Sequence, residues 1–201
     1  SENQLKIGIK LVTKLWNAFR FVGEHISDSH PSPSELGIVN AWLMNAVTNT
    51  FSEYKKHLDA NEFSLALSAI ESFFWNDFCY NYLELVKNQL FNPQDYSEKE
   101  VANTKWVLHD VGLRILQMYA PYLPYITDTL YQELYATDHG VPSVHMSKFN
   151  NAQVPYVILE SLERQMFTDF DAVSAQTMDA INNIVSQVRK LKTNEQLSLK
   201  T

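Results

Sequence analysis

The sequence contains a single cysteine, Cys79, and only 5 glycines in 201 residues. One thiol cannot form an intrachain disulfide or a thiolate-rich metal site, which fits a reducing, cytoplasmic environment. So few glycines argue against β-rich folds with many tight turns and against glycine-rich phosphate-binding loops. Long apolar runs are also missing, since Arg114, Gln117 and two prolines interrupt the most apolar stretch, 111–126. No association with a membrane is expected.

An excess of basic residues is missing as well. The formal net charge is −7, from 23 acidic and 16 basic side chains. Proteins that coat nucleic acid without specificity normally carry a basic excess, so this class is disfavoured. A local basic stripe on an acidic body stays possible. The hydrophobic fraction of 45% and the charged fraction of 19% are those of a folded chain.

Catalytic and metal-binding motifs are also absent from the sequence. It has no Gly-x-Ser-x-Gly, His-Glu-x-x-His or Walker pattern, and none of the Glu-x-x-His pairs of di-iron bundles. Glu53 and His57 are one helical turn apart, and we interpret them as a solvated pair. Cys79 stands between two aromatic residues, which favours a packed thiol over a nucleophile. We therefore predict no catalytic residue, no metal ligand and no cofactor held by this chain.

Apolar residues recur at helical spacing between the prolines and almost never alternate, which predicts an all-α fold. We expect an up-and-down bundle of about five helices, then a linker and one further long helix. The bundle is expected to occupy 1–136, and the linker with the C-terminal helix 137–201. The expected helices of the bundle cover approximately residues 5–26, 33–57, 62–91, 97–119 and 121–134, and the last helix covers about 171–192.

Three of these helices have clear start signals, and Asp59–Glu62 offers a weaker one for the third helix. The segment Ser32–Glu35 reads as a capping box with Pro33 in the first helical position. Ser97 and Glu100 form a second capping box for the fourth helix. Pro121 is expected at an early position of the fifth helix.

The first expected helix carries an aromatic residue on the side opposite its expected core face. At 100° per residue, that core face consists of Leu5, Ile9, Val12, Trp16, Phe19 and Ile26. The opposite stripe consists of Lys10, Lys14, Asn17 and Phe21. An ammonium group can hold a phosphate, an amide can read a base edge, and a ring can stack on a base. The same spacing also suits packing of Phe21 against another helix, so both interpretations stay open.

The third expected helix repeats this arrangement. Its apolar face consists of Phe63, Leu67, Ile70, Phe74, Phe78 and Leu85. The nearly opposite stripe consists of Asn76, Tyr80, Leu83 and Lys87. Two such stripes on neighbouring helices would form a groove for unstacked bases, whereas a central helix of a bundle could bury both of its faces.

Four segments carry a resemblance to a known family. The run Lys14–Phe21 resembles the first-helix signature of the anticodon-binding domain of class I valyl-tRNA synthetases, and Phe73–Lys87 resembles the third-helix pattern of that domain. Tyr119–Tyr131 and Ser143–Phe149 resemble the elements that follow. These segments stand in the order that the family shows and span residues 14–149.

The resemblance implies that the chain is a non-catalytic part of a larger enzyme. The parent would activate valine with ATP and Mg²⁺ and esterify it to tRNA(Val). Its catalytic and editing domains would belong to the same polypeptide and precede residue 1. The partners implied for this chain are tRNA(Val) and those two domains.

The resemblance also assigns roles to individual residues. Contact with the anticodon is implied for Lys14, Asn17, Phe21 and Leu83. Contact with the tRNA backbone, or support of the site, is implied for Lys10, Arg20, Tyr80 and Lys87. Two alternatives stay open: the same domain of an isoleucyl- or leucyl-tRNA synthetase, or a purely structural helical module. The structural module predicts that Phe21 and Leu83 are buried against partner helices, with no basic groove beside them.

Overall fold

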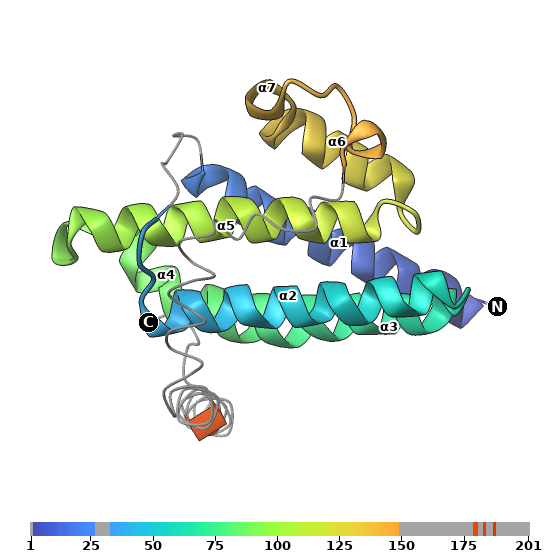
Figure 1. Cartoon of the computed structure of the whole chain (residues 1–201), viewed down its shortest axis with the longest axis horizontal. Coiled ribbons are helices and arrows are strands. Elements are labelled where there is room, and N and C mark those ends of the chain that lie inside the picture. The colour runs from blue at the N-terminus through green and yellow to red at the C-terminus, as the bar shows by residue number, and fades with distance from the viewer. Residues whose placement is uncertain (1, 27–32, 149–178, 181–182, 184–186, 188–201) are drawn as a thin grey trace.

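The structure, a computed structural model, describes residues 2–26, 33–148, 179–180, 183 and 187. Within these residues all regular structure is helical, with no strand, which confirms the expected all-α bundle (Figure 1). The elements are α1 (Glu2–His25), α2 (Ile38–Asp59), α3 (Phe63–Ser72), η1 (Phe73–Tyr82), α4 (Leu83–Phe91), η2 (Pro93–Asp95), α5 (Glu98–Tyr119), α6 (Pro124–Leu134), α7 (Ala136–His139) and η3 (Val144–Met146). Most of the helix expected at 171–192 lies outside the described residues.

Helix α5 is the centre of the bundle and contacts α1, α2, α3, α4 and α6. Its inward side is buried and mostly apolar, with Val107, Val111 and Ile115 among the core residues. Gly112 on the same helix has no side chain, so the Tyr135 hydroxyl can approach its backbone closely. None of the helices in the described part of the chain is both long and apolar enough to cross a lipid bilayer.

Elements α3, η1 and α4 form one continuous helix, as expected for residues 62–91. Its middle section, η1, is a π-helix, in which each N–H reaches a carbonyl five residues back. At its end the Leu83 N–H donates to the Phe78 carbonyl oxygen. A π-helix has a wider turn than an α-helix, so η1 changes which side chains line up on each face. Such segments are frequent at functional sites.

A buried chain of hydrogen bonds ties this long helix to α2 and α5. The Tyr82 hydroxyl donates to Oδ1 of Asn40 at 2.7 Å, and Nδ2 of Asn40 donates to Oγ1 of Thr104 at 3.0 Å. The Thr104 hydroxyl in turn donates to Oε1 of Gln89 at 2.7 Å. These hydrogen bonds link η1, α2, α5 and α4, and each of the four side chains has a hydrogen-bond partner.

One of the three expected helix starts is confirmed. The side chain of Ser97 accepts from the Glu100 N–H at 3.3 Å, and the Glu100 carboxylate accepts from the Ser97 N–H at 3.1 Å. The expected start at Pro33 is wrong, because α2 begins only at Ile38. Nδ2 of Asn103 on α5 instead donates to the carbonyl oxygen of Glu35 at 2.8 Å. This carbonyl oxygen is therefore bonded to a side chain of another helix and not to an N–H of α2.

The expected early helical position of Pro121 is also wrong. The N–H groups of Tyr122 and Leu123 both donate to the carbonyl oxygen of Tyr119, which closes a turn after α5. Leu123 has φ −130° and ψ 60°, outside the helical region. Pro124 therefore takes the first position of α6, where its missing N–H costs nothing.

The expected core face of α1 is wrong in part. Phe19 and Ile26 are buried, but Ile9 and Trp16 are 58% and 48% exposed. The buried side of α1 consists of Leu11, Leu15, Ala18, Phe19, Val22 and Ile26. The buried face thus includes Leu11, Leu15 and Phe19, while Ile9 and Trp16 lie outside it. The stripe with Lys14 and Phe21 consequently flanks the core face and does not lie opposite it.

Candidate nucleic-acid interface

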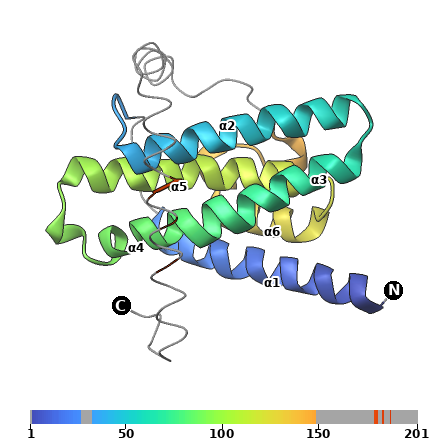
Figure 2. The same ribbon diagram turned by 90° about the horizontal axis from the view of Figure 1, so that it is seen from below.

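Helix α1 runs alongside η1 and α4 (Figure 2). Side chains of these elements line a groove between them. Its α1 wall consists of Lys14, Asn17, Ala18 and Phe21, and its other wall consists of Cys79, Leu83, Glu84 and Lys87. The two walls are some 60 residues apart in the sequence, and the fold brings them together. The groove encloses about 190 Å³.

The two walls of the groove run in the same direction. At one end, the Lys14 ammonium nitrogen lies 5.6 Å from the centroid of the Trp75 ring, a cation–π contact. At the other end, the ring centroids of Phe21 and Phe91 are 5.9 Å apart. The middle of α1 therefore faces the start of η1, and the end of α1 faces the end of α4.

The floor of the groove is apolar. Phe21 and Leu83 are half-buried and pack against the core, while Ala18 and Cys79 are buried. Burial raises the pKa of the Cys79 thiol to about 12, although the nearby Lys14 opposes this shift. The thiol is therefore neutral at physiological pH, and the prediction of a packed cysteine is confirmed. The floor offers apolar surface and no reactive nucleophile.

The rim of the groove is polar and carries a local positive charge. Lys14 and Lys87 contribute two ammonium groups, and Glu84 contributes one carboxylate, so the groove itself has an excess of one positive charge. The Lys87 Nζ lies 3.9 Å from Oε1 of Glu84, with both side chains partly exposed. Asn17 adds an exposed amide. This rim can meet a phosphate through its ammonium groups and a base edge through its amide and carboxylate.

Five of the eight residues proposed for tRNA contact line this groove: Lys14, Asn17, Phe21, Leu83 and Lys87. Lys10, Arg20 and Tyr80 do not line it, although all three are exposed. Tyr80 belongs to the π-helical turns. Cys79 comes four residues before Leu83 and lines the groove beside it.

Sequence reasoning missed several residues of this region. Glu84 follows Leu83 directly and lines the groove, although it is not part of the apolar–cationic stripe. His25 comes four residues after Phe21, and Phe91 comes four residues after Lys87. Extending each stripe by one helical turn would therefore have included both rings.

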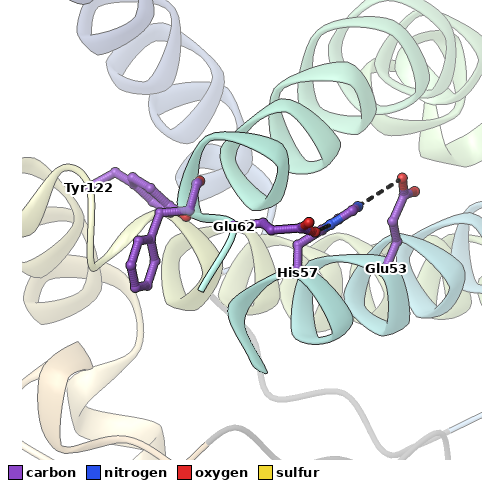
Figure 3. Close-up of polar contacts among 5 residues, drawn as sticks. Glu53, His57, Glu62 and Tyr122 are labelled. Carbon is purple, nitrogen blue, oxygen red and sulfur yellow. Dashed lines mark hydrogen bonds and ion pairs between the residues drawn. The ribbon is translucent and has the colours of Figure 1, made fainter. Parts of the chain in front are cut away.

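A second polar cluster lies at the corner between α2 and α3 (Figure 3). Nδ1 of His57 lies 2.7 Å from the carboxylate of Glu62 and its Nε2 lies 3.8 Å from that of Glu53. The Tyr122 hydroxyl donates to the carbonyl oxygen of Phe63 nearby, at 2.8 Å. Both glutamates are exposed, so the carboxylate of the His57–Glu53 pair is open to solvent. The cluster joins the end of α2 to the start of α3.

Comparison with known proteins places the chain in a family. A family model described as the anticodon-binding domain of tRNA ligase matches residues 40–201. The valine–tRNA ligase of Anaplasma marginale (strain St. Maries) is 34% identical over 100% of the chain and 22% of the relative. That of Wolbachia sp. subsp. Brugia malayi (strain TRS) is 36% identical over 100% of the chain and 22% of the relative.

A relative from a third organism gives the same result. The valine–tRNA ligase of Haloarcula marismortui is 36% identical over 70% of the chain and 15% of the relative. The chain thus spans less than a quarter of the length of these curated relatives. Since the family model matches most of its residues, the chain belongs to the family of anticodon-binding domains of tRNA ligases.

Proposed function

We propose that the chain is the anticodon-binding part of a valine–tRNA ligase and that the groove between α1 and η1–α4 receives an anticodon nucleotide of tRNA(Val). The single observation that carries the proposal is the meeting of Lys14, Asn17 and Phe21 with Leu83 and Lys87 across one groove. Family membership and the names of the relatives support it. Both walls also carry the segments that resemble valyl-tRNA synthetases.

The groove suits a single base better than an enclosed metabolite. Its volume of about 190 Å³ is below the range of about 300–1,000 Å³ typical of small-molecule pockets. A base splayed from the anticodon loop would lay its face on Phe21 and Leu83. The amide of Asn17 would meet its edge, and Lys14 and Lys87 would hold the flanking phosphates.

Lys10, Arg20 and Tyr80 are proposed to support the tRNA outside the groove. All three are exposed, and Lys10 precedes Lys14 by one helical turn. Ammonium, guanidinium and hydroxyl groups contact phosphate or sugar oxygens and fix the position of an RNA without reading its sequence. We therefore assign these residues to affinity and not to discrimination between anticodons.

We assign ATP and Mg²⁺ to the catalytic domain of the parent enzyme. Among the described residues, no three His, Cys, Asp or Glu side chains gather where they could hold a metal ion. In the parent, this domain would hold the anticodon while separate catalytic and editing domains act on the acceptor end, in the cytoplasm. We also propose the division into a bundle at 1–136 and a linker with a C-terminal helix at 137–201.

The two alternatives are separated by specific observations. A sibling isoleucyl or leucyl enzyme is disfavoured by the relatives, which are named valine–tRNA ligases. A purely structural module does not account for lysines beside a half-open aromatic ring. Competition with isoleucine and leucine tRNAs tests the first alternative, since we expect valine tRNA to bind more tightly than either.

The proposal is tested by truncating the stacking ring and measuring binding of valine tRNA to the whole chain. Phe21→Ala is expected to weaken binding about tenfold, the size of one lost base stack. Phe63→Ala is the matched control, because Phe63 is 56% exposed and lies 16 residues before the groove on the same continuous helix. Equal losses in both variants, or no loss in Phe21→Ala, would defeat the proposal.

A further inference from the structure

The groove continues past its lining residues into a cluster of three rings. This ring cluster consists of Phe21, His25 and Phe91. The centroid of Phe21 lies 4.8 Å from that of His25 and 5.9 Å from that of Phe91, and the His25 and Phe91 centroids are 5.5 Å apart. The interplanar angles are 63°, 66° and 84°, so every pair meets edge to face.

Phe91 is fixed by this cluster but is not covered by it. Its side chain is 55% exposed although it contacts two other rings. Phe91 is the last residue of α4, because Asn92 leaves the helical region at φ −126° and ψ 59°. No further turn of α4 therefore covers the ring, and one side of an oriented aromatic surface is open.

His25 has charged groups of both signs near it as well as two aromatic rings. Burial lowers the pKa of His25, Glu24 opposes the shift, and the positive charge of Lys105 on α5 adds to it. Glu24 and Lys105 therefore place one charge of each sign near the ring cluster, with the influence of the Glu24 carboxylate the larger of the two. Nε2 of His25 is buried without a hydrogen-bond partner among the described residues, so the imidazole contributes to the ring cluster through its ring contacts.

We propose that the ring cluster is a second nucleotide subsite, in which Phe91 stacks on the base next to the one held in the groove. The proposal rests on the proposed function, because it extends the same tRNA site by one nucleotide. From Asn17 to His25, α1 rises about 12 Å, which leaves room for a second base beyond Phe21. The ligand class is a single-stranded loop of RNA with splayed bases.

The experiment combines protein variants with RNAs that lack one base. The RNA is the anticodon stem-loop of valine tRNA, either intact or with a single abasic site at each loop position in turn. We expect Phe91→Ala and Phe91→Leu each to bind the intact RNA about tenfold more weakly. Phe91→Leu keeps an apolar contact with Phe21 and His25, so a loss there reports the ring itself. Phe91→Trp is expected to restore binding, and Phe63→Ala is the matched control.

The position of the abasic site identifies the stacking partner. We expect one abasic RNA to bind wild type and Phe91→Ala equally, because the base that Phe91 stacks on is already missing. A different abasic site should cancel the effect of Phe21→Ala. If the same site cancels both effects, Phe91 only supports the ring of Phe21, and the second subsite is overturned. Unchanged binding of Phe91→Leu to the intact RNA would overturn it as well.

Failure of the proposed function gives a different result. Wild type would then bind the valine stem-loop no more tightly than a stem-loop with a scrambled loop sequence, which overturns the proposed function and the second subsite together. A clear preference of wild type for the valine loop, combined with no effect of Phe91→Leu, overturns the second subsite alone.

Discussion

The hydroxyl of Tyr82 donates a 2.7 Å hydrogen bond to Oδ1 of Asn40, and both residues are buried. Tyr82 directly precedes Leu83 in the groove wall, so this bond ties the wall to α2. Burial raises the pKa of Tyr82 well above its usual value, which keeps the phenol protonated and able to donate. This buried hydrogen bond therefore supports the groove wall from the core side, where a ligand in the groove does not contact it.

Removal of this bond should destabilise the fold. Tyr82→Phe leaves a buried amide oxygen without its donor, and we expect the free energy of unfolding to fall by about 1–3 kcal/mol. Asn40→Ala should cost a similar amount, and the double variant should cost less than the sum of the two. Urea unfolding measures all three. Tyr125→Phe is the control, since Tyr125 is 89% exposed. Unchanged stability of Tyr82→Phe would show that the bond contributes nothing.

Lys14 should contribute to the salt dependence of tRNA binding. If its ammonium group meets a phosphate, Lys14→Ala loses one released counterion, and the slope of log K against log salt becomes less negative by about 1. Binding titrations between low and moderate salt measure the slope. Lys56→Ala, on the exposed side of α2, is the control. The same slope in wild type and in Lys14→Ala would remove Lys14 from the site.

Cys79 should be unreactive although it lines the groove. Its raised pKa, about 12, means that almost no thiolate is present at pH 8, and only 7% of the residue is exposed. We expect negligible modification by a thiol reagent in the native protein and rapid modification in denaturant. Fast labelling of the native protein at pH 8 would contradict the packed environment.

His25 should make stability depend on pH. Burial lowers the pKa of His25 in the folded protein below the unfolded value of 6.5. The unfolded state therefore binds more protons between these two values, and stability that is present above pH 6.5 is lost as the pH falls through the folded pKa. We expect wild type to lose more stability between pH 7.5 and 5.5 than His25→Phe, measured by urea unfolding at both values.

A direct titration supplies the check on His25. Its imidazole signals in an NMR titration should move at a pH below 6.5. A midpoint at or above 6.5 would contradict the buried, neutral imidazole and the sign of the expected pH effect.

The helices were predictable where the signal lay within a few residues. Ser97 and Glu100 cap α5 through contacts only three residues apart, so the sequence alone identifies the start. The start of α2 was not predictable in this way, because Asn103 of α5 engages the carbonyl oxygen of Glu35 from 68 residues away. Ile9 and Trp16 show the same limitation, since which apolar residues of a helix are buried depends on the neighbouring helices.

The composition of the candidate site was partly predictable from each helix alone. The spacing placed Lys14 with Phe21 on one stripe and Leu83 with Lys87 on another. That the two stripes face each other is a property of the tertiary packing. Tyr80 does not line the groove, because the turns of η1 are π-helical. The spacing of residues in the sequence does not indicate a π-helix. Contact of these side chains with tRNA stays a prediction.

The most direct test of the central claim is the affinity of the whole chain for valine tRNA compared with the same tRNA carrying a replaced anticodon, at one stated salt concentration. We predict that wild type prefers the valine anticodon at least tenfold, and that Phe21→Ala loses most of this preference. Equal affinity of wild type for both tRNAs would contradict anticodon recognition by the groove.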